Sequence, residues 1–307
     1  MPMSVFELIS SEKSFARKWI GHAKLNEYGL HKARIRLADA CLAARRFQDL
    51  GTPANFGTFL RDGIVALPNY LPTDAFTAIK KEALESFAAA ADTYPIVGNT
   101  VRKGFGDKQP FPGGFDRYDG GTLNRFLDIT EEKTPACFKF ASALGISQLY
   151  RKAAGTIRRP GKFQLYQTVH GDDGANPDNQ KLLHRDTFHS AVKLWYFFKD
   201  VEPEHGPLDY VVGSHKMNDK RLKWEHQKSV RASSGRPGVT QGGAFRATPA
   251  DLRYMGLPQP TSFPVKANTL VIADIRGFHR RGHAETHSER LGIYANFRPF
   301  PFSPVRC

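Results

Sequence analysis

Three potential metal ligands stand out in the second half of the chain. His184 and Asp186 are separated by one residue in LLHRDTFHS, and His279 follows the strand-like run NTLVIADIRGF. Residues two apart on an extended chain point to the same side, so His184 and Asp186 can face one metal ion while Arg185 points away. Two histidines and one carboxylate on one face form the facial triad of non-haem Fe(II) sites, which leaves coordination positions free for other molecules.

An arginine, Arg290, lies eleven residues after the third ligand candidate, His279. In facial-triad sites a 2-oxoacid can occupy two of the free positions, and a guanidinium can grip its distal carboxylate through a bidentate fork that lysine cannot reproduce. Arg290 is our candidate for this contact, with 2-oxoglutarate as the cosubstrate. His283 and His287 lie near His279, but we prefer His279 because it follows the strand directly and keeps the spacing to Arg290.

Other polar residues near these motifs have ordinary structural explanations. His189 and Thr187 could line a pocket or stabilise a turn, and the pattern does not decide between the two. His215 in GSHK is typical of a turn between strands. The aromatic run Trp195–Phe198 is typical of a strand that packs into a core.

The triad requires elements that bring distant segments together, and the second half of the chain is predicted to supply strands. Short β-like runs are separated there by turns rich in Gly, Pro, Asn and Asp, at 162–169, 191–201, 208–213, 268–274 and 291–300. A basic segment, 216–246, is inserted between two of these runs.

The first half of the chain is predicted to be mostly helical. Residues 4–47 have apolar positions at three- and four-residue steps, and a helix is expected to begin at an N-cap on Thr73. Residues 61–72 predict a short strand, and the Gly-rich, aromatic stretch 104–121 predicts long loops. Helices early and strands late favour a mainly β fold in which N-terminal helices wrap a barrel or sandwich. We place the division at an N-terminal helical basic segment, 1–60, and a β domain, 61–307.

The charge balance favours an anionic partner. The 307 residues include 44 Lys and Arg against 30 Asp and Glu, a formal net charge of +14, which suits phosphate, nucleic acid or an acidic lipid surface. Nucleic acid is the weaker choice, because the chain has no zinc-finger spacing, helix-turn-helix signature or RNA-binding aromatic motif.

Cysteine usage and hydropathy indicate the compartment. Three cysteines, Cys41, Cys137 and Cys307, are too few and too far apart for a disulfide framework or a metal clip. The N-terminus has no continuous apolar stretch of the signal-peptide type, and no segment approaches the ~18 apolar residues of a membrane span. These features predict a cytoplasmic protein.

The ordered set His184, Asp186, His279 and Arg290 resembles the phytanoyl-CoA dioxygenase family of Fe(II)/2-oxoglutarate oxygenases. The segments LLHRDTFHSAVKLWYFFKDVEPEHGPLDYVVGSHK and NTLVIADIRGFHRRG look like a bacterial branch of it, and the likeness covers roughly residues 60–300. The resemblance implies a double-stranded β-helix, a jelly-roll or cupin-like barrel with the iron at its mouth. It also implies that His184, Asp186 and His279 bind iron and that Arg290 anchors 2-oxoglutarate.

Three further positions are assigned or questioned by the resemblance. Gln167 falls where relatives place a polar pocket residue. Arg281 stands two residues after the distal histidine, where relatives often have a small or hydroxyl residue, so a hydrogen bond to the cosubstrate is either missing or supplied by another group. Val212 replaces a proline that is common in the turn VVGSHK.

These observations predict an Fe(II)/2-oxoglutarate-dependent dioxygenase that hydroxylates an unactivated C–H bond. The basic segments 17–46 and 216–246 would suit an anionic small molecule or glycolipid, for example the Kdo sugar of a lipopolysaccharide precursor, with peripheral contact to an anionic membrane. Two alternatives remain: a non-catalytic basic protein that binds nucleic acid or an anionic ligand on a β-barrel, and a barrel isomerase or hydrolase that uses another divalent metal.

Overall fold

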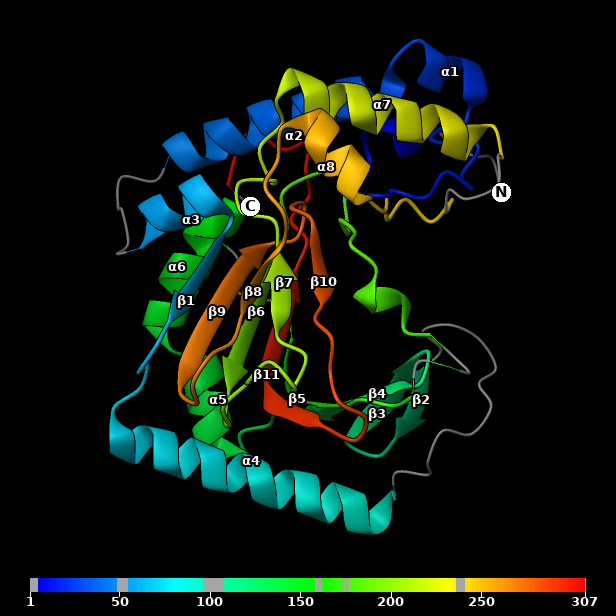
Figure 1. The fold of residues 1–307 in the computed structure, drawn as a ribbon. Helices are drawn as coiled ribbons and strands as arrows, with labels where there is room; N and C mark the ends of the chain where they lie inside the picture. The colour runs from blue at the N-terminus through cyan, green and yellow to red at the C-terminus, as the bar shows by residue number, and fades with distance from the viewer. Residues whose placement is uncertain are drawn as a thin grey trace.

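Two β-sheets face each other at the centre of the molecule (Figure 1). The computed structural model describes residues 5–48, 55–95, 108–157, 162–172, 174, 177–235 and 241–306. The larger sheet is antiparallel, with the order β1 (Ile64–Leu67), β9 (Thr269–Asp274), β6 (Val192–Phe197), β11 (Glu289–Phe297), β5 (Phe163–Val169), β4 (Thr122–Asp128), β3 (Gly114–Asp119) and β2 (Lys108–Phe111). The smaller sheet has the order β10 (His279–Arg281), β7 (Leu208–Tyr210) and β8 (Thr261–Phe263).

The chain passes back and forth between the two sheets from β5 onward. β5 and β6 belong to the larger sheet, β7 and β8 to the smaller, β9 to the larger, β10 to the smaller and β11 to the larger. Apolar side chains from both sheets, including Phe197, Val271 and Tyr210, pack against one another between them. This is the double-stranded β-helix that the sequence predicts, and each of the five predicted β-like runs overlaps a strand of it.

Helices cover the outer face of the larger sheet. α3 (Phe56–Asp62), α4 (Thr73–Thr93), α5 (Pro135–Ala141) and α6 (Leu144–Ala154) surround this face. Leu194 and Tyr196 of β6 point into the core formed with these helices. Because side chains alternate along a strand, Lys193 and Trp195 point to the inner face, between the sheets.

A second group of helices closes one end of the barrel, at the top of Figure 1. It comprises the 3-10 turn η1 (Val5–Ile9) and the helices α1 (Ala23–Glu27), α2 (Leu30–Phe47), α7 (Asp219–Ser233) and α8 (Pro249–Met255). Phe15, Trp224 and Phe245 contribute to a core that also contains Leu183 and Phe278, which flank the predicted metal ligands in sequence. The N-terminal segment and the basic insert therefore pack on the strands that carry the triad.

The structure corrects several boundaries. Residues 10–22 are not helical, so the helix predicted over 4–47 is reduced to α1 and α2. Residues 104–107 of the predicted loop region 104–121 lie outside the described residues. Residues 108–119 form a β-hairpin of strands β2 and β3, where loops were predicted. The helix predicted from Thr73 is present, but Pro72 takes the N-cap position. The division between residues 60 and 61 stays a prediction; both residues lie in α3.

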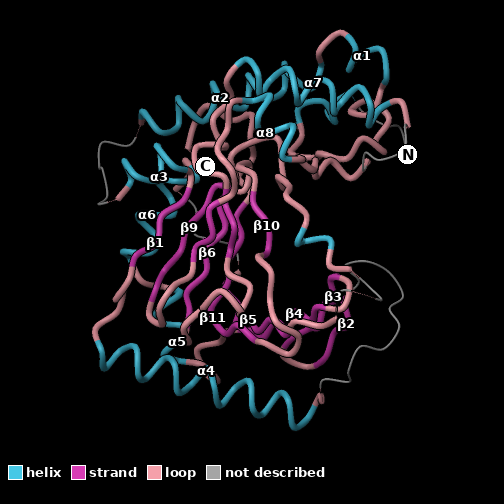
Figure 2. The backbone as a smooth tube through the Cα atoms, in the orientation of Figure 1, coloured by secondary structure: helices cyan, strands magenta, loops and turns pink. Residues whose placement is uncertain are grey.

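Several elements were not predicted at all. They include the helices α5, α6, α7 and α8. They also include the 3-10 turn η2 (Asn179–Lys181), which lies just before His184. Figure 2 shows this turn as a short cyan segment to the right of β10. No helix within the described ranges is both long and apolar enough to cross a membrane.

Candidate metal centre

A short extended segment, 183–186, carries two of the three ligand candidates. The backbone N–H of His184 donates to the carbonyl oxygen of His279 (3.0 Å), and the N–H of His279 donates back to His184 (2.8 Å). The Asp186 N–H donates to the carbonyl of Ile275 (2.9 Å), so the segment is paired with the chain that leads into β10. This pairing fixes the separation between the two parts of the triad, which are far apart in sequence.

The alternation predicted for this segment is observed. His184 and Asp186 point toward His279, whereas the Arg185 side chain lies on the opposite side of the segment. Arg185 is fully buried there and forms a bidentate ion pair with Glu225 of α7, with N–O distances of 3.0 and 2.6 Å. Glu225 lies in the basic insert, 216–246. The insert thus supplies the carboxylate that holds Arg185, the residue between the two ligand candidates.

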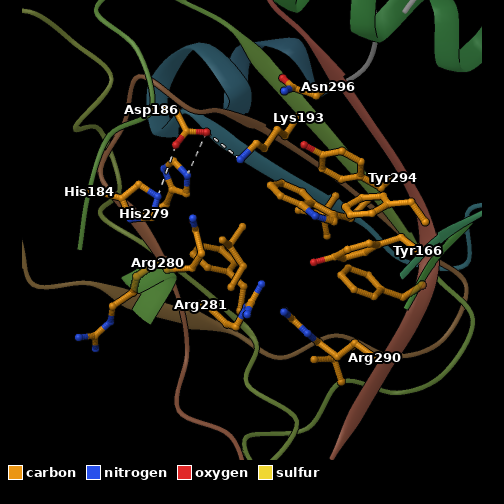
Figure 3. Close-up of a pocket in the computed structure, with 18 of the residues that line it drawn as sticks. Tyr166, His184, Asp186, Lys193, His279, Arg280, Arg281, Arg290, Tyr294 and Asn296 are labelled. Atoms are coloured by element: carbon orange, nitrogen blue, oxygen red, sulfur yellow. Dashed lines mark ion pairs between the residues drawn. The ribbon is translucent and has the colours of Figure 1, made fainter. Parts of the chain in front are cut away.

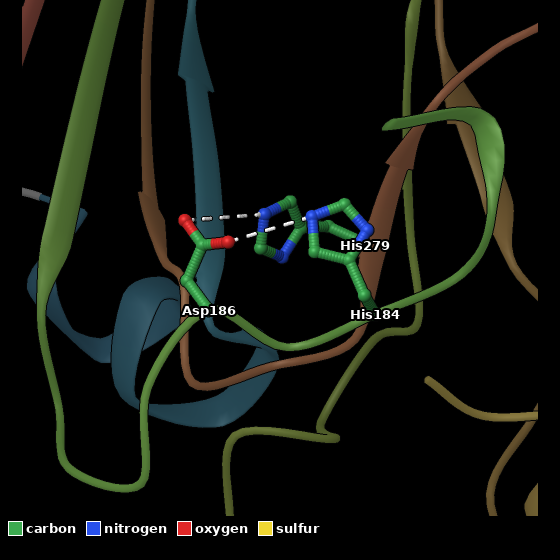
Figure 4. Close-up of side chains that lie close together, drawn as sticks. All are labelled: His184, Asp186 and His279. Atoms are coloured by element: carbon green, nitrogen blue, oxygen red, sulfur yellow. Dashed lines mark ion pairs between the residues drawn. The ribbon is translucent and has the colours of Figure 1, made fainter. Parts of the chain in front are cut away.

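The three side chains converge on one point (Figure 4). One potential ligand atom from each of His184, Asp186 and His279 lies within 4.8 Å of the others. The distance from His184 Nε2 to Asp186 Oδ1 is 3.4 Å, and that from His279 Nε2 to Asp186 Oδ2 is 3.9 Å. Two imidazole nitrogens and one carboxylate at this spacing match the facial-triad donor set.

Backbone carbonyls fix the tautomer of both histidines. His184 Nδ1 lies 2.7 Å from the Leu182 oxygen, and His279 Nδ1 lies 2.9 Å from the Gly277 oxygen. A carbonyl oxygen can only accept, so Nδ1 carries a proton in both rings, and the Nε2 atom of each ring is the one directed toward Asp186 and available as a metal ligand. The buried Nε2 of His279 has no hydrogen-bond partner among the described residues. An orphaned lone pair of this kind fits a bound cation.

Burial and nearby charge favour the metal-binding forms of His279 and Asp186. Burial, and to a lesser extent His184, lowers the pKa of His279 to about 3, so its ring is neutral at physiological pH. Burial alone would raise the pKa of Asp186, but the Lys193 ammonium, 2.7 Å from Oδ2, holds it well below its usual range. Asp186 is therefore ionised.

Cations from two other parts of the chain lie close to Asp186. The ammonium group of Lys13, from the N-terminal segment, donates to the Asp186 backbone oxygen. Burial and the nearby Arg298 lower the pKa of Lys13 to about 8. An Arg298 nitrogen lies 3.6 Å from Asp186 Oδ2.

The triad opens onto a cavity of about 240 Å³ between the two sheets (Figure 3). Lysine and arginine contribute six of the lining side chains, whereas Asp186 is the only carboxylate among the lining residues within the described part of the chain. The six cations are Arg117, Lys193, Arg280, Arg281, Arg290 and Arg298. Much of the remaining wall is aromatic, from Phe126, Tyr166, Trp195, Phe197, Phe263 and Tyr294.

Arg290 projects from β11 into this cavity, at a distance from the triad (Figure 3). Its side chain is buried, and no hydrogen bond or ion pair joins it to another described residue. Burial lowers its pKa to about 10. A buried guanidinium without a protein acceptor can bind a carboxylate from a ligand.

Arg281 occupies the position where the family resemblance led us to expect a small or hydroxyl side chain. It is buried and pairs with Asp178, and its NH2 group donates to Asn124 Oδ1 (2.7 Å). Arg281 also lines the cavity, so it brings a second guanidinium to the wall, although one that the protein already satisfies.

The other predicted positions lie elsewhere. Gln167 does not line the cavity in the described part of the chain; its amide donates to Glu289 (3.1 Å), and the neighbouring Tyr166 lines the wall instead. His283 and His287 are exposed. His189 and Thr187 are buried away from the cavity lining, and His215 hydrogen-bonds the Leu60 carbonyl, in keeping with a structural role.

Three cations around the triad were missed by sequence reasoning. Lys193 could have been found from the alternation of β6, because it is the polar residue on an otherwise apolar strand. Arg298 follows β11 on the same face as Arg290, so strand alternation also identifies it. Nothing in the sequence pattern indicates that Lys13 reaches Asp186, because the contact depends on how the N-terminal segment packs against residues 241–246.

Comparison with known proteins was made against family models, curated proteins and solved structures. The family model described as phytanoyl-CoA dioxygenase (PhyH) matches residues 59–237, more than half of the chain. The comparison with curated proteins gave no match.

The similar solved structures include those of SnoN, AviO1 and HygX. The epimerase SnoN in complex with Fe3+, alpha-ketoglutarate and nogalamycin RO has a TM-score of 0.46 at 18% identity, covering 80% of this chain and 84% of that one. AviO1 from Streptomyces viridochromogenes Tue57 has a TM-score of 0.49 at 18% identity, covering 80% and 94%. HygX from Streptomyces hygroscopicus with nickel, 2-oxoglutarate and hygromycin B has a TM-score of 0.43 at 16% identity, covering 81% and 88%.

Proposed function

Starting from the fact that the chain belongs to the phytanoyl-CoA dioxygenase (PhyH) family, we propose that it is an Fe(II)/2-oxoglutarate-dependent dioxygenase that hydroxylates an unactivated C–H bond of an anionic substrate. The observation that carries the proposal is the buried triad of His184, Asp186 and His279, whose two fixed tautomers and ionised carboxylate present three ligand atoms to one point. The donor set suits Fe(II) and leaves room for a bidentate 2-oxoacid.

Each residue has a distinct role in this proposal. His184, Asp186 and His279 would hold the iron, and Arg290 would bind the distal carboxylate of 2-oxoglutarate with its unpaired guanidinium. When bound, iron and 2-oxoglutarate supply an oxidant from dioxygen as 2-oxoglutarate is converted to succinate and carbon dioxide. The aromatic wall would exclude water from the reacting carbon.

The proposed substrate is an anionic small molecule or the anionic headgroup of a glycolipid, with the Kdo sugar of a lipopolysaccharide precursor as one example. The support is the excess of cationic side chains around the cavity, because a wall of one sign raises the local concentration of an oppositely charged ligand. The two buried free thiols, Cys41 and Cys137, suit the cytoplasmic location that we propose for the enzyme.

Peripheral contact with an anionic membrane is a further part of the proposal. However, some of the basic residues of segment 17–46 are not available for this contact. Arg34 and Arg45 belong to the basic segment 17–46, which was predicted to suit an anionic membrane, whereas both side chains are buried. Arg34 donates to three backbone carbonyls of the N-terminal segment, and Arg45 donates to the C-terminal segment. Any basic surface at this end of the molecule must therefore use other cations.

Exposed cations nearby include Arg17, Lys18, Lys24, Arg36 and Lys223. Co-sedimentation with anionic and neutral vesicles at low and high salt tests whether they bind a membrane. Changing Arg17, Lys18 and Lys24 to Gln should reduce recovery with anionic vesicles at low salt, because each such cation contributes about 1 kcal/mol. Equal recovery of both proteins at every salt concentration would argue for a freely diffusing substrate.

The central test is anaerobic reconstitution with Fe(II), followed by addition of 2-oxoglutarate, ascorbate and air. Release of succinate that disappears in His279→Ala supports the assignment. Metal binding without consumption of 2-oxoglutarate would favour the isomerase or hydrolase class. Failure to bind a divalent metal would favour a non-catalytic binding protein.

A further inference from the structure

The cations that line the cavity differ in whether the protein already satisfies them. Three have a carboxylate partner outside the triad, namely Arg117 with Asp119, Arg280 with Asp209 and Arg281 with Asp178. Lys193 holds Asp186 at 2.7 Å. Arg290 has no partner among the described residues, and Arg298 has only the 3.6 Å contact with the same Asp186 oxygen that Lys193 holds. Two guanidinium groups therefore retain capacity for an anion.

These two arginines cannot bind the same small anion. Arg290 is the second residue of β11, and Arg298 follows the last residue of that strand. Their even spacing places both on the inner face of the sheet, and eight steps along a strand separate their Cα atoms by roughly 26 Å. The short diacid 2-oxoglutarate, bound between the triad and Arg290, would leave Arg298 unused.

The charges around the triad indicate that Arg298 lacks a sufficient anionic partner within the described part of the chain. Lys193 and Arg298 both contact the Asp186 carboxylate, and Lys13 contacts the backbone oxygen of the same residue, so three cations gather around one acid. A divalent metal on the triad would add positive charge and withdraw part of the Asp186 charge from these three groups. Like charges gathered in this way repel one another unless an anion lies among them.

We propose that Arg298 forms a second anion site at the metal-proximal end of the cavity, distinct from the cosubstrate site at Arg290, and that it receives the phosphate or carboxylate group of the substrate. A guanidinium binds either group through two parallel hydrogen bonds, and the ammonium groups near Asp186 add charge. The identity of the occupant as the substrate rests on the proposed function, whereas the anion site itself does not.

The site would also constrain where the substrate is oxidised. An anionic group held at Arg298 lies on the Asp186 side of the triad, and 2-oxoglutarate would extend from the metal toward Arg290. The reactive carbon would then lie close to the substrate's charged group. Arg298 would be a specificity-determining residue that positions the substrate without contacting the metal.

Calorimetric titration of inorganic phosphate and of acetate into the metal-free full-length chain tests the site directly. Arg298→Gln should weaken binding of the preferred anion at least about tenfold, since a hydrogen bond to a charged group is lost. Arg298→Lys keeps the charge without the fork and should be intermediate. Arg231→Gln, on the exposed face of α7, is the matched control and should bind as the unmodified protein does.

The two anion sites are separated by a second titration, of 2-oxoglutarate in the presence of Mn(II). Arg290→Gln should lose 2-oxoglutarate binding and keep phosphate or acetate binding, and phosphate should not displace 2-oxoglutarate. The proposal is overturned if the unmodified chain binds neither anion, if Arg298→Gln binds as tightly as the control, or if Arg290→Gln loses both ligands. Succinate release in the reconstitution assay reports on the proposed function independently of these results.

Discussion

Replacing Arg290 with methionine should stabilise the metal-free protein while it weakens 2-oxoglutarate binding. The Arg290 side chain is 9% exposed and has no acceptor among the described residues. Burial, the dominant cause, lowers its pKa from 12.5 to about 10. A base whose pKa is lowered on folding is disfavoured in its charged form. The full free-energy cost of burying the charged Arg290 guanidinium therefore applies at every pH well below 10. The difference converts to about 3 kcal/mol.

The size of the effect on melting can be worked out from chain length. An unfolding entropy of about 2.1 cal/mol/K per residue gives roughly 0.6 kcal/mol/K for this chain. Removing a cost of about 3 kcal/mol should therefore raise Tm by about 5 °C, measured by calorimetry without metal or cosubstrate. The same change removes a bidentate contact with 2-oxoglutarate, so the KM for 2-oxoglutarate should rise by about a hundredfold. Arg290→Lys should rescue poorly.

Arg281→Met is the matched control, because Arg281 is equally buried but paired. Its removal would leave the Asp178 carboxylate without its main partner, which costs about 3–5 kcal/mol and should lower Tm by about 5–8 °C. The two substitutions are thus expected to shift Tm in opposite directions. A fall in Tm for Arg290→Met would refute the reasoning. A rise in Tm with an unchanged KM would transfer the anchoring role to Arg280, Arg281 or Arg298.

Three further outcomes are expected. Alanine at any one of the proposed ligands His184, Asp186 and His279 should abolish iron-dependent succinate release, with little change in Tm at the two histidines, whereas His283→Ala should retain activity; the reverse result would move the distal ligand. Glu225→Gln should lower Tm by about 5–8 °C and weaken Mn(II) binding, because Arg185 and Arg221 lose their shared buried acid; an unchanged Tm would contradict this role. Burial lowers the pKa of His31 and His215 to about 4, so below pH 6.5 the unfolded chain takes up protons that the folded chain does not. Stability in urea should therefore fall between pH 6.5 and 4 by about 1.4 kcal/mol per pH unit for each histidine, and His215→Gln should flatten that slope.

The triad and its strands could be predicted because their signals are local. Alternation within 183–186 follows from an extended backbone, and the strand before His279 is a continuous apolar run bounded by turns. The hairpin of β2 and β3 could not be found in this way. Pro110 and Gly114 argue against a strand, but β2 is the edge of the sheet, where proline is tolerated, and β3 is held by its pairing with β4.

The N-terminal contribution to the site was hidden for a different reason. Lys13 lies in a segment with no regular structure, and its contact with Asp186 spans 173 positions of the chain. Phe15 places this segment by packing against Phe245, and its N–H donates to Gln241. Contacts of this range depend on the complete tertiary arrangement, and periodicity within one segment contains no information about them.

The basic composition illustrates how a bulk property can mislead about partners. Arg34, Arg45 and Arg46 belong to the basic segment 17–46, yet each donates to at least one backbone carbonyl and joins helix α2 to other parts of the chain. A buried arginine with several acceptors is a structural crosslink, because leaving those carbonyls unpaired would cost free energy. Positive charge points to a partner only where the fold leaves it without an acceptor. Among the lining residues that the structure describes, that criterion selects Arg290, followed by Arg298, whose one carboxylate contact is the 3.6 Å approach to Asp186. The anions that this protein binds should therefore be sought at the cavity before they are sought on the helices.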